Sequence, residues 1–142
     1  MAVENYMQLK VKALPDNESF VRCVVGAFCV PLSPTLEEIN DIKTAVSEAV
    51  TNSVIHGYPD AEGDIFVEAK ISGNEVFITI ADEGVGIPDV CKALEPFFTT
   101  RPEDERSGMG FTVMQAFTDN LEVLPNAPHG TIVRMKKTIH GK

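Results

Sequence analysis

A long amphipathic helix, predicted over residues 35–56, constrains the fold of this chain more than any other stretch. Its apolar residues recur three and four positions apart, and a glycine, the usual residue just beyond a helix end, follows it directly. Two N-terminal caps fit the sequence: Ser33 with Pro34 in the first turn, or Thr35 with Glu38 as a capping box. Both caps start the helix at nearly the same place.

One face of this helix carries Glu48, Asn52 and His56, which are spaced four residues apart. Each step of four rotates the helix by only about 40°, so the three side chains form one polar stripe. Such a stripe is usually the hydrated face of a helix, but this one has no Lys or Arg and no ion pair at i,i+4 spacing. A carboxylate can accept a proton, and an amide oxygen suits Mg²⁺. The stripe therefore places an acid and an amide side by side, while His56 is assigned a structural role at the helix end.

Length and charge limit the class of protein. The chain has 142 residues, 44% of them hydrophobic, which predicts one globular domain over residues 1–142. Its 12 basic and 21 acidic residues give a net charge of −9, which argues against direct nucleic-acid binding and suits a basic protein partner. No apolar run is long enough for a membrane span, so no membrane association and a cytoplasmic location are expected. The three cysteines match no metal-binding spacing and are expected to be reduced and buried.

The remaining periodicities predict an α+β, two-layer α/β sandwich, with helices on one face of a mixed, mostly antiparallel sheet. Residues 95–107 are polar and irregular, as in a functional lid. The other expected elements are a strand over 6–13, a helix over 18–30, a hairpin of strands over 64–71 and 75–81, a short helix over 89–94, a helix over 111–118, and strands over 121–124 and 131–139.

Two glycine motifs lie next to predicted elements. Asp82-x-Gly84-x-Gly86 directly follows a strand, where the glycines let the backbone turn sharply and approach a ligand. Gly108-Met109-Gly110 precedes a helix, whose free N-terminal amides favour phosphate. Alone, each motif is more often a plain turn than a ligand site. A Walker-type phosphate loop is excluded because the chain has no G-x-x-x-x-G-K-[ST] sequence.

In combination and in order, these motifs resemble the ATP-binding fold of the Bergerat (GHKL) superfamily. The stretches 47–58 and 98–112 are more closely similar to the anti-sigma F factors of spore-forming bacteria, and the resemblance covers essentially the whole chain. Three departures are small: Ala81 replaces an expected basic residue, Phe97 a usual Leu and Arg101 a usual Lys. Of these, Ala81 is expected to alter the rim of the adenine pocket.

The resemblance implies a role for each matching residue. Asp82 would recognise the adenine amino group, with Thr131 helping through water. Asn52 would coordinate Mg²⁺ at the phosphates, and Glu48 would be the general base. The other residues assigned to the nucleotide are Gly84 and Gly86 beside the purine, and Thr99, Thr100, Arg101, Arg106, Ser107, Gly108, Met109 and Gly110 along the lid and phosphates. Either Arg101 or Arg106 is expected to reach the γ-phosphate.

The implied function is that of an anti-sigma factor and serine-protein kinase. Using Mg-ATP, such a protein binds and inhibits a sporulation sigma factor and phosphorylates a serine of its anti-anti-sigma antagonist. A homodimer is implied as well, with Arg22 facing a partner. Two alternatives stay open: a general-stress switch kinase, and a binding module that holds ATP without transferring phosphate. The catalytic domain of a histidine kinase fits less well, because the 34 residues before the second helix contain no histidine.

Overall fold

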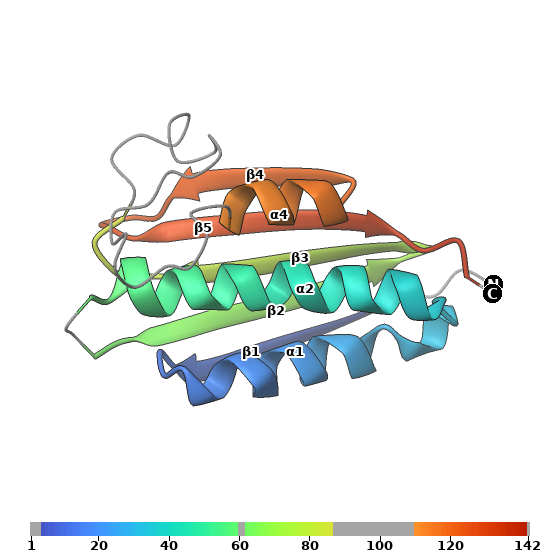
Figure 1. Cartoon of the computed structure of the whole chain (residues 1–142), viewed down its shortest axis with the longest axis horizontal. Helices are drawn as coiled ribbons and strands as arrows, with labels where there is room; N and C mark the ends of the chain where they lie inside the picture. Colours follow the sequence, from blue (N-terminus) through green and yellow to red (C-terminus); the bar gives the residue numbers. More distant parts are fainter. Residues whose placement is uncertain (1–3, 60–61, 87–109, 142) are drawn as a thin grey trace.

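The computed structural model describes residues 4–59, 62–86 and 110–141, and its helices cover one face of a sheet (Figure 1). This arrangement confirms the predicted α+β sandwich and, within the described residues, the predicted order of helices and strands. The expected helix over 89–94 and lid over 95–107 lie outside the described residues. The elements are β1 (Glu4–Lys12), α1 (Asp16–Phe28), the 3₁₀ turn η1 (Val30–Leu32), α2 (Leu36–Asn52), the π turn η2 (Ser53–Gly57), β2 (Asp64–Ser72), β3 (Glu75–Asp82), α4 (Gly110–Phe117), β4 (Asn120–Pro125) and β5 (Thr131–Thr138).

The sheet has the strand order β1-β2-β3-β5-β4, so β3 is central. A mixed, mostly antiparallel sheet was expected, and every pair among the described strands is antiparallel. Asp82, the last residue of β3, is paired with Ile65 on β2 and with Thr131 on β5. The candidate site therefore begins at one end of the most protected strand.

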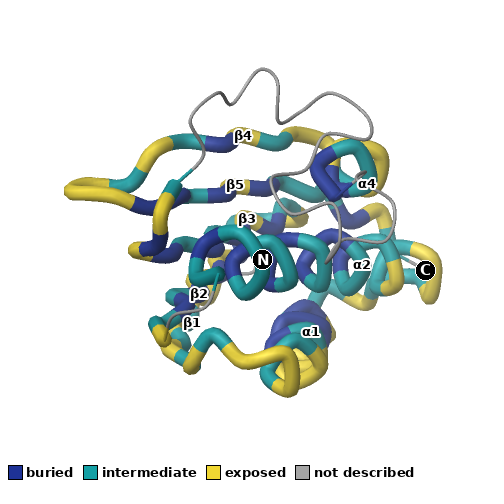
Figure 2. The backbone as a smooth tube through the Cα atoms, turned by 60° about the vertical axis from the view of Figure 1, so that its left-hand side comes forward, coloured by how far each residue is buried: buried dark blue, intermediate teal, exposed yellow. Residues whose placement is uncertain are grey.

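The core lies between the sheet and the helices, where dark blue segments meet in Figure 2. Along β2, buried residues alternate with more exposed ones, as expected for a strand covered on one face. Burying a large aliphatic side chain contributes about 1.5–3 kcal/mol, so this face holds the site's framework together. The largest fully buried side chains include Ile42, Val46 and Val50 of α2, Ile65, Val67 and Ile71 of β2, Val76 and Ile80 of β3, and Met114 of α4.

The N-terminus of α2 uses the second of the two predicted caps. The Glu38 amide donates to Thr35 Oγ1 (3.1 Å), and the Thr35 amide donates to Glu38 Oε1 (2.9 Å). The Glu38 carboxylate also accepts from the backbone amides of His140 (2.7 Å) and Gly141 (3.1 Å). One carboxylate thus caps the helix and fixes the segment that follows β5.

The C-terminus of α2 differs from the expected α-helix to His56. Regular α geometry ends at Asn52, and residues 53–57 form a π turn in which the Tyr58 amide donates to the Ser53 carbonyl (3.1 Å). A π turn holds more residues than an α turn. Gly57 is consequently the last residue of this turn and is buried, instead of lying just beyond an α-helix.

The cysteines only partly follow expectation. Cys29 is fully buried, as predicted, but Cys23 is exposed on α1, so the prediction was wrong for that residue. Cys91 lies outside the described residues.

Candidate nucleotide site

Asp82 is a buried carboxylate held by three hydrogen bonds. The Ser53 hydroxyl donates to Oδ2 (2.8 Å), and the amides of Gly84 (3.0 Å) and Thr131 (3.3 Å) donate to Oδ1. These donors come from the end of α2, the loop after β3 and the start of β5. Three segments distant in the sequence therefore fix the orientation of one carboxyl group.

Burial raises the pKa of Asp82 above its ordinary value, and the hydrogen bonds from Gly84, Ser53 and Thr131 oppose this rise. All three donors are neutral groups. The charge of this carboxylate is thus balanced by dipoles alone, which leaves it a strong acceptor in a site of low polarity.

Close backbone contacts surround Asp82. A Cβ atom on Gly84 would lie 1.9 Å from the Gly57 carbonyl oxygen, and one on Gly57 would lie 3.0 Å from the Asp82 carboxylate. The Val85 amide donates to the same Gly57 carbonyl (2.8 Å). Gly86 has a φ of +80°, which side chains other than glycine rarely adopt. The end of α2 and the loop after β3 are therefore packed backbone against backbone.

Tyr58 supports the same loop from the outside. Its hydroxyl donates to the Asp64 carbonyl (2.8 Å) and accepts from the Glu83 amide (2.7 Å). A Cβ on Gly63 would lie 2.1 Å from the Tyr58 ring, so a glycine there makes room for the aromatic side chain.

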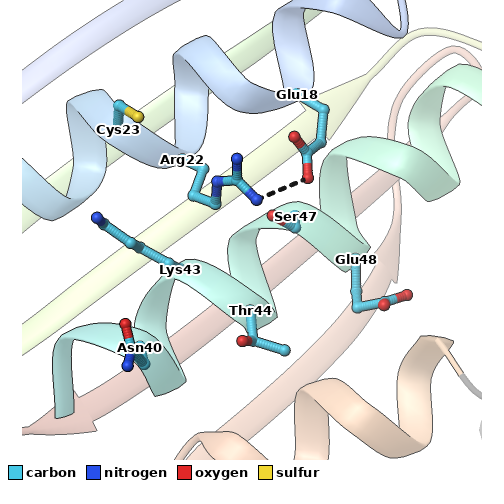
Figure 3. Close-up of a pocket in the computed structure, with 8 residues that line it drawn as sticks. All are labelled: Glu18, Arg22, Cys23, Asn40, Lys43, Thr44, Ser47 and Glu48. Carbon is cyan, nitrogen blue, oxygen red and sulfur yellow. Dashed lines mark ion pairs between the residues drawn. The ribbon is translucent and has the colours of Figure 1, made fainter. Parts of the chain in front are cut away.

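A hollow of about 500 Å³ lies between α1 and α2 (Figure 3). Arg22 lies between the two helices, 3.6 Å from a Glu18 oxygen, and donates to the Ser19 hydroxyl (2.7 Å). Glu48 also lines this groove but lies on the side of α2 toward α4. Asn52 follows one turn later, at the end of α2. The groove thus connects the predicted partner residue with the predicted base.

Comparison with known proteins identifies the architecture. Residues 11–137 match the model of the histidine kinase-like ATPase domain. An anti-sigma F factor of Thermoanaerobacter pseudethanolicus is 57% identical over 139 residues, covering 98% of this chain and 97% of the relative. One of Clostridium acetobutylicum is 52% identical over 135 residues, covering 95% and 94%. The chain belongs to the anti-sigma F factor family.

The fold is shared with a solved structure of much lower identity. A crystal structure of the RsbU and RsbW domains of a Mycobacterium tuberculosis protein superposes with a TM-score of 0.67 at 20% identity, covering 95% of this chain and 32% of the other. Together, the domain match and the relatives make this an anti-sigma factor with a GHKL-type, ATP-binding domain.

The predicted site residues of this anti-sigma factor fall into three groups. Gly84 and Thr131 donate to the Asp82 carboxylate, and Gly86 lies next to the backbone of Gly130, the residue before Thr131. Glu48 and Asn52 share α2, and Gly110 is the buried first residue of α4, which packs against α2. The predictions for Thr99, Thr100, Arg101, Arg106, Ser107, Gly108 and Met109 lie outside the described residues.

The expectation for Ala81 needs correction. Side chains alternate along β3, so Ala81 is on the sheet face opposite to that of Asp82. It is paired with Phe66 on β2 and with Ile132 on β5. A basic residue at position 81 would extend from the uncovered face of the sheet, and Ala81 therefore does not alter the rim around Asp82.

The residues fit an adenine nucleotide on two counts. An ionised carboxylate offers about four acceptor positions, and Asp82 uses three, which leaves one for an exocyclic amine. Among the described residues, the buried Asn52 Nδ2 atom has no hydrogen-bond partner, a situation that costs about 1–3 kcal/mol unless a ligand or another segment supplies one.

A metal ion at this site would need ligands from its substrate. Within the described ranges, no three His, Cys, Asp or Glu side chains gather as a metal site. Mg²⁺ typically binds through one or two protein oxygens together with phosphates and water. The side-chain amide oxygen of Asn52 is the ligand atom on α2 that suits this arrangement.

In the described part of the chain, no helix is long and apolar enough to cross a membrane.

Sequence reasoning did not identify several supporting residues. Ser53 follows the apolar spacing of its helix and reads as a core position, yet its hydroxyl binds Asp82. Tyr58 was noted only as part of a motif. Asn126 and His129, in the turn between β4 and β5, contact the backbone of the Asp82 loop. A polar residue at an apolar helix position was the one available signal, and it pointed to Ser53.

Proposed function

We propose that this anti-sigma factor is also an ATP-dependent serine-protein kinase. It would bind and inhibit a sporulation sigma factor and phosphorylate a serine of the anti-anti-sigma protein that opposes it. The observation that carries the proposal is the groove between α1 and α2, because Arg22 and Glu48 line it together. A protein docked on Arg22 would therefore lie next to a carboxylate suited to deprotonating a hydroxyl.

Each described residue has a defined task in this proposal. Asp82 accepts a hydrogen bond from the adenine amino group through its remaining acceptor position, and Thr131 supports it. Asn52 would hold Mg²⁺, which would supply positive charge to offset that of the phosphates. Glu48 takes the proton of the incoming serine hydroxyl. Because the chain has no Walker lysine, Arg101 or Arg106 would supply further positive charge.

The proposed partners follow from charge and from the family. A net charge of −9 favours association with a basic surface on a sigma factor. Arg22 would pair with an acidic group on either partner, in the manner of a rim charge. We further propose a homodimer in the cytoplasm, the arrangement that the family resemblance implies.

The direct test is to incubate the protein with γ-labelled ATP and a candidate anti-anti-sigma protein, and to map the modified residue. Transfer to a serine is expected, and Glu48→Gln should lower the rate at least about 100-fold while ATP binding is retained. Glu37→Gln, an exposed change on the same helix, is the matched control. Unchanged transfer by Glu48→Gln would remove Glu48 from the role of base.

The same assay separates the alternatives. Tight ATP binding and sigma-factor binding with no transfer to any antagonist would indicate a non-catalytic binding module. Transfer only to the antagonist of a general-stress sigma factor would indicate a switch kinase of that type. Arg22→Ala should weaken partner binding about tenfold and leave ATP affinity unchanged, since Arg22 lies on α1 and away from Asp82.

A further inference from the structure

The turn between β4 and β5 reaches across to the loop that follows β3. Asn126 Nδ2 donates to the Asp82 carbonyl oxygen (2.9 Å), and His129 Nδ1 lies 2.9 Å from the Gly84 carbonyl oxygen. We propose that Asn126 and His129 are positioning residues, which hold the Asp82 carboxylate in the orientation that selects adenine. This inference rests on the proposed role of Asp82 in nucleotide recognition.

In both contacts the side chain must be the hydrogen-bond donor. A carbonyl oxygen can only accept, so His129 Nδ1 must carry the hydrogen in this contact. The contact is therefore available both to the neutral Nδ1–H tautomer and to the charged ring. Asn126 must likewise present its amide nitrogen, and not its oxygen, to the Asp82 carbonyl.

The turn is itself held in place, so its side chains can restrain the Asp82–Gly84 segment. The Ala127 amide donates to Asn126 Oδ1 (2.9 Å), and the Asn126 amide donates to the Gly130 carbonyl (3.1 Å). Both polar atoms of the Asn126 side chain are thus engaged. Gly130, at a φ of +118°, brings the turn so close that a Cβ there would lie 2.1 Å from the Asp82 carbonyl oxygen.

The turn and the following strand hold both the backbone carbonyl and the side-chain carboxylate of Asp82. Asn126 binds its carbonyl, and the Thr131 amide, five residues later in the sequence, binds its carboxylate. His129 adds a third point at Gly84, whose amide also donates to the carboxylate. Loss of either side-chain contact should let the Asp82–Gly84 segment rotate, which would misdirect the free acceptor position of Asp82.

Nucleotide selectivity reports on this orientation more specifically than stability does. Adenine presents an amino group to a carboxylate, whereas guanine presents a carbonyl oxygen at the same ring position and is repelled. A rotated carboxylate would bind ATP less well and reject GTP less well. A purely structural contact would change the melting temperature but leave the ratio of the two affinities unaltered.

The experiment measures dissociation constants for ATP and GTP by titration calorimetry on the full chain. Asn126→Asp keeps the shape and the acceptor for Ala127 but replaces the donor with a carboxylate facing a carbonyl. His129→Leu removes the donor, and His129→Asn restores a nitrogen donor near the position of Nδ1. Asn126→Asp and His129→Leu should each weaken ATP about tenfold and reduce the ATP preference over GTP at least about threefold.

For His129→Asn, the ATP affinity and the ATP preference over GTP should both stay within about twofold of the parent protein. Parental selectivity in folded Asn126→Asp and His129→Leu would overturn the inference and leave the role of Asp82 intact. A parent protein that binds ATP and GTP equally would instead overturn the role of Asp82, and this inference with it. Because His129 is exposed, its variants are expected to fold and keep the test decisive even if Asn126→Asp does not.

Discussion

The Ser53 hydroxyl donates a 2.8 Å hydrogen bond to Asp82 Oδ2, although the two residues are 29 positions apart. This bond joins the turn that ends α2 to the last residue of β3. Both residues are buried, with 4% and 3% of their surfaces exposed. An uncompensated carboxylate at such a position would be strongly destabilising, so the hydroxyl and the two backbone amides are needed for the site to exist.

Replacing Asp82 with asparagine should separate function from stability. The oxygen of the introduced amide would still accept from the Gly84 and Thr131 amides, and its nitrogen could donate to the Ser53 hydroxyl oxygen. Because burial raises the pKa of Asp82, the charged form is disfavoured in the folded protein, and its removal should leave the melting temperature unchanged or higher. ATP affinity should fall about tenfold or more, since an amide nitrogen would face the adenine amine.

Titration calorimetry and thermal melting of Asp82→Asn, with the neighbouring Glu83→Gln as control, would measure both effects. ATP affinity equal to that of the parent would exclude Asp82 as the adenine acceptor. A large loss of stability would show that the carboxylate contributes more to folding than its burial suggests.

Adding a methyl group at Gly84 should damage both the fold and the site. The new Cβ would lie 1.9 Å from the Gly57 carbonyl oxygen, which belongs to the backbone and cannot move aside without shifting the end of α2. We expect Gly84→Ala to lower the free energy of unfolding by about 3 kcal/mol, as severe overpacking does.

Gly73→Ala is the matched control, because a Cβ there meets nothing within 4 Å and the cost is limited to its φ of +63°. That cost should be about 1 kcal/mol. Urea denaturation of the two variants would compare them, and a similar loss in both would show that the Gly57–Gly84 contact is easily relieved.

The Glu38 carboxylate should give the protein an acid-sensitive contribution to stability. Partial burial raises its pKa, but the hydrogen bonds from Thr35, His140 and Gly141 outweigh this and lower the pKa from 4.5 to about 2. Since the folded-state pKa is the lower one, the contribution is fully present above the unfolded value and is lost as pH falls from about 4.5 to 2.

The difference in unfolding free energy between the parent and Glu38→Gln should therefore be largest above about pH 5 and shrink toward zero near pH 2. Its maximum should be about 1 kcal/mol, because Glu38 is only partly buried and solvent screens its charge. Denaturation curves collected over this pH range, with the exposed neighbour Glu37→Gln for comparison, would check the trend. A difference independent of pH would assign the effect to packing.

The two described cysteines should differ sharply in reactivity. Cys29 is fully buried, and burial raises the pKa of its thiol to about 11. At about pH 8 only about one molecule in a thousand would then carry the reactive thiolate at this position. Alkylation followed by peptide mass mapping should label the exposed Cys23 rapidly and Cys29 only after unfolding. Equal labelling rates in the native protein would mean that α1 separates readily from the core.

Local pattern alone determined a large part of this protein. Alternation predicted the hairpin of β2 and β3, three-and-four spacing predicted α2, and a motif after a strand placed Asp82 in a turn with Gly84. Such features depend on residues a few positions apart, whose relative directions are fixed by backbone geometry. The choice between two caps was the limit of this reasoning, because Ser33 and Thr35 both satisfy the local rules.

Only the tertiary structure decided which distant groups meet. Pairing of β3 with β5 places Thr131 beside Asp82, and the π turn brings Ser53 and Gly57 to the same carboxylate. Because the helices cover only the sheet face that carries Asp82, Ala81 on the opposite face is directed away from the site. Neither register nor the contact of Asn126 with Asp82, 44 residues apart, has a local signature, because both depend on how the helix layer packs against the sheet.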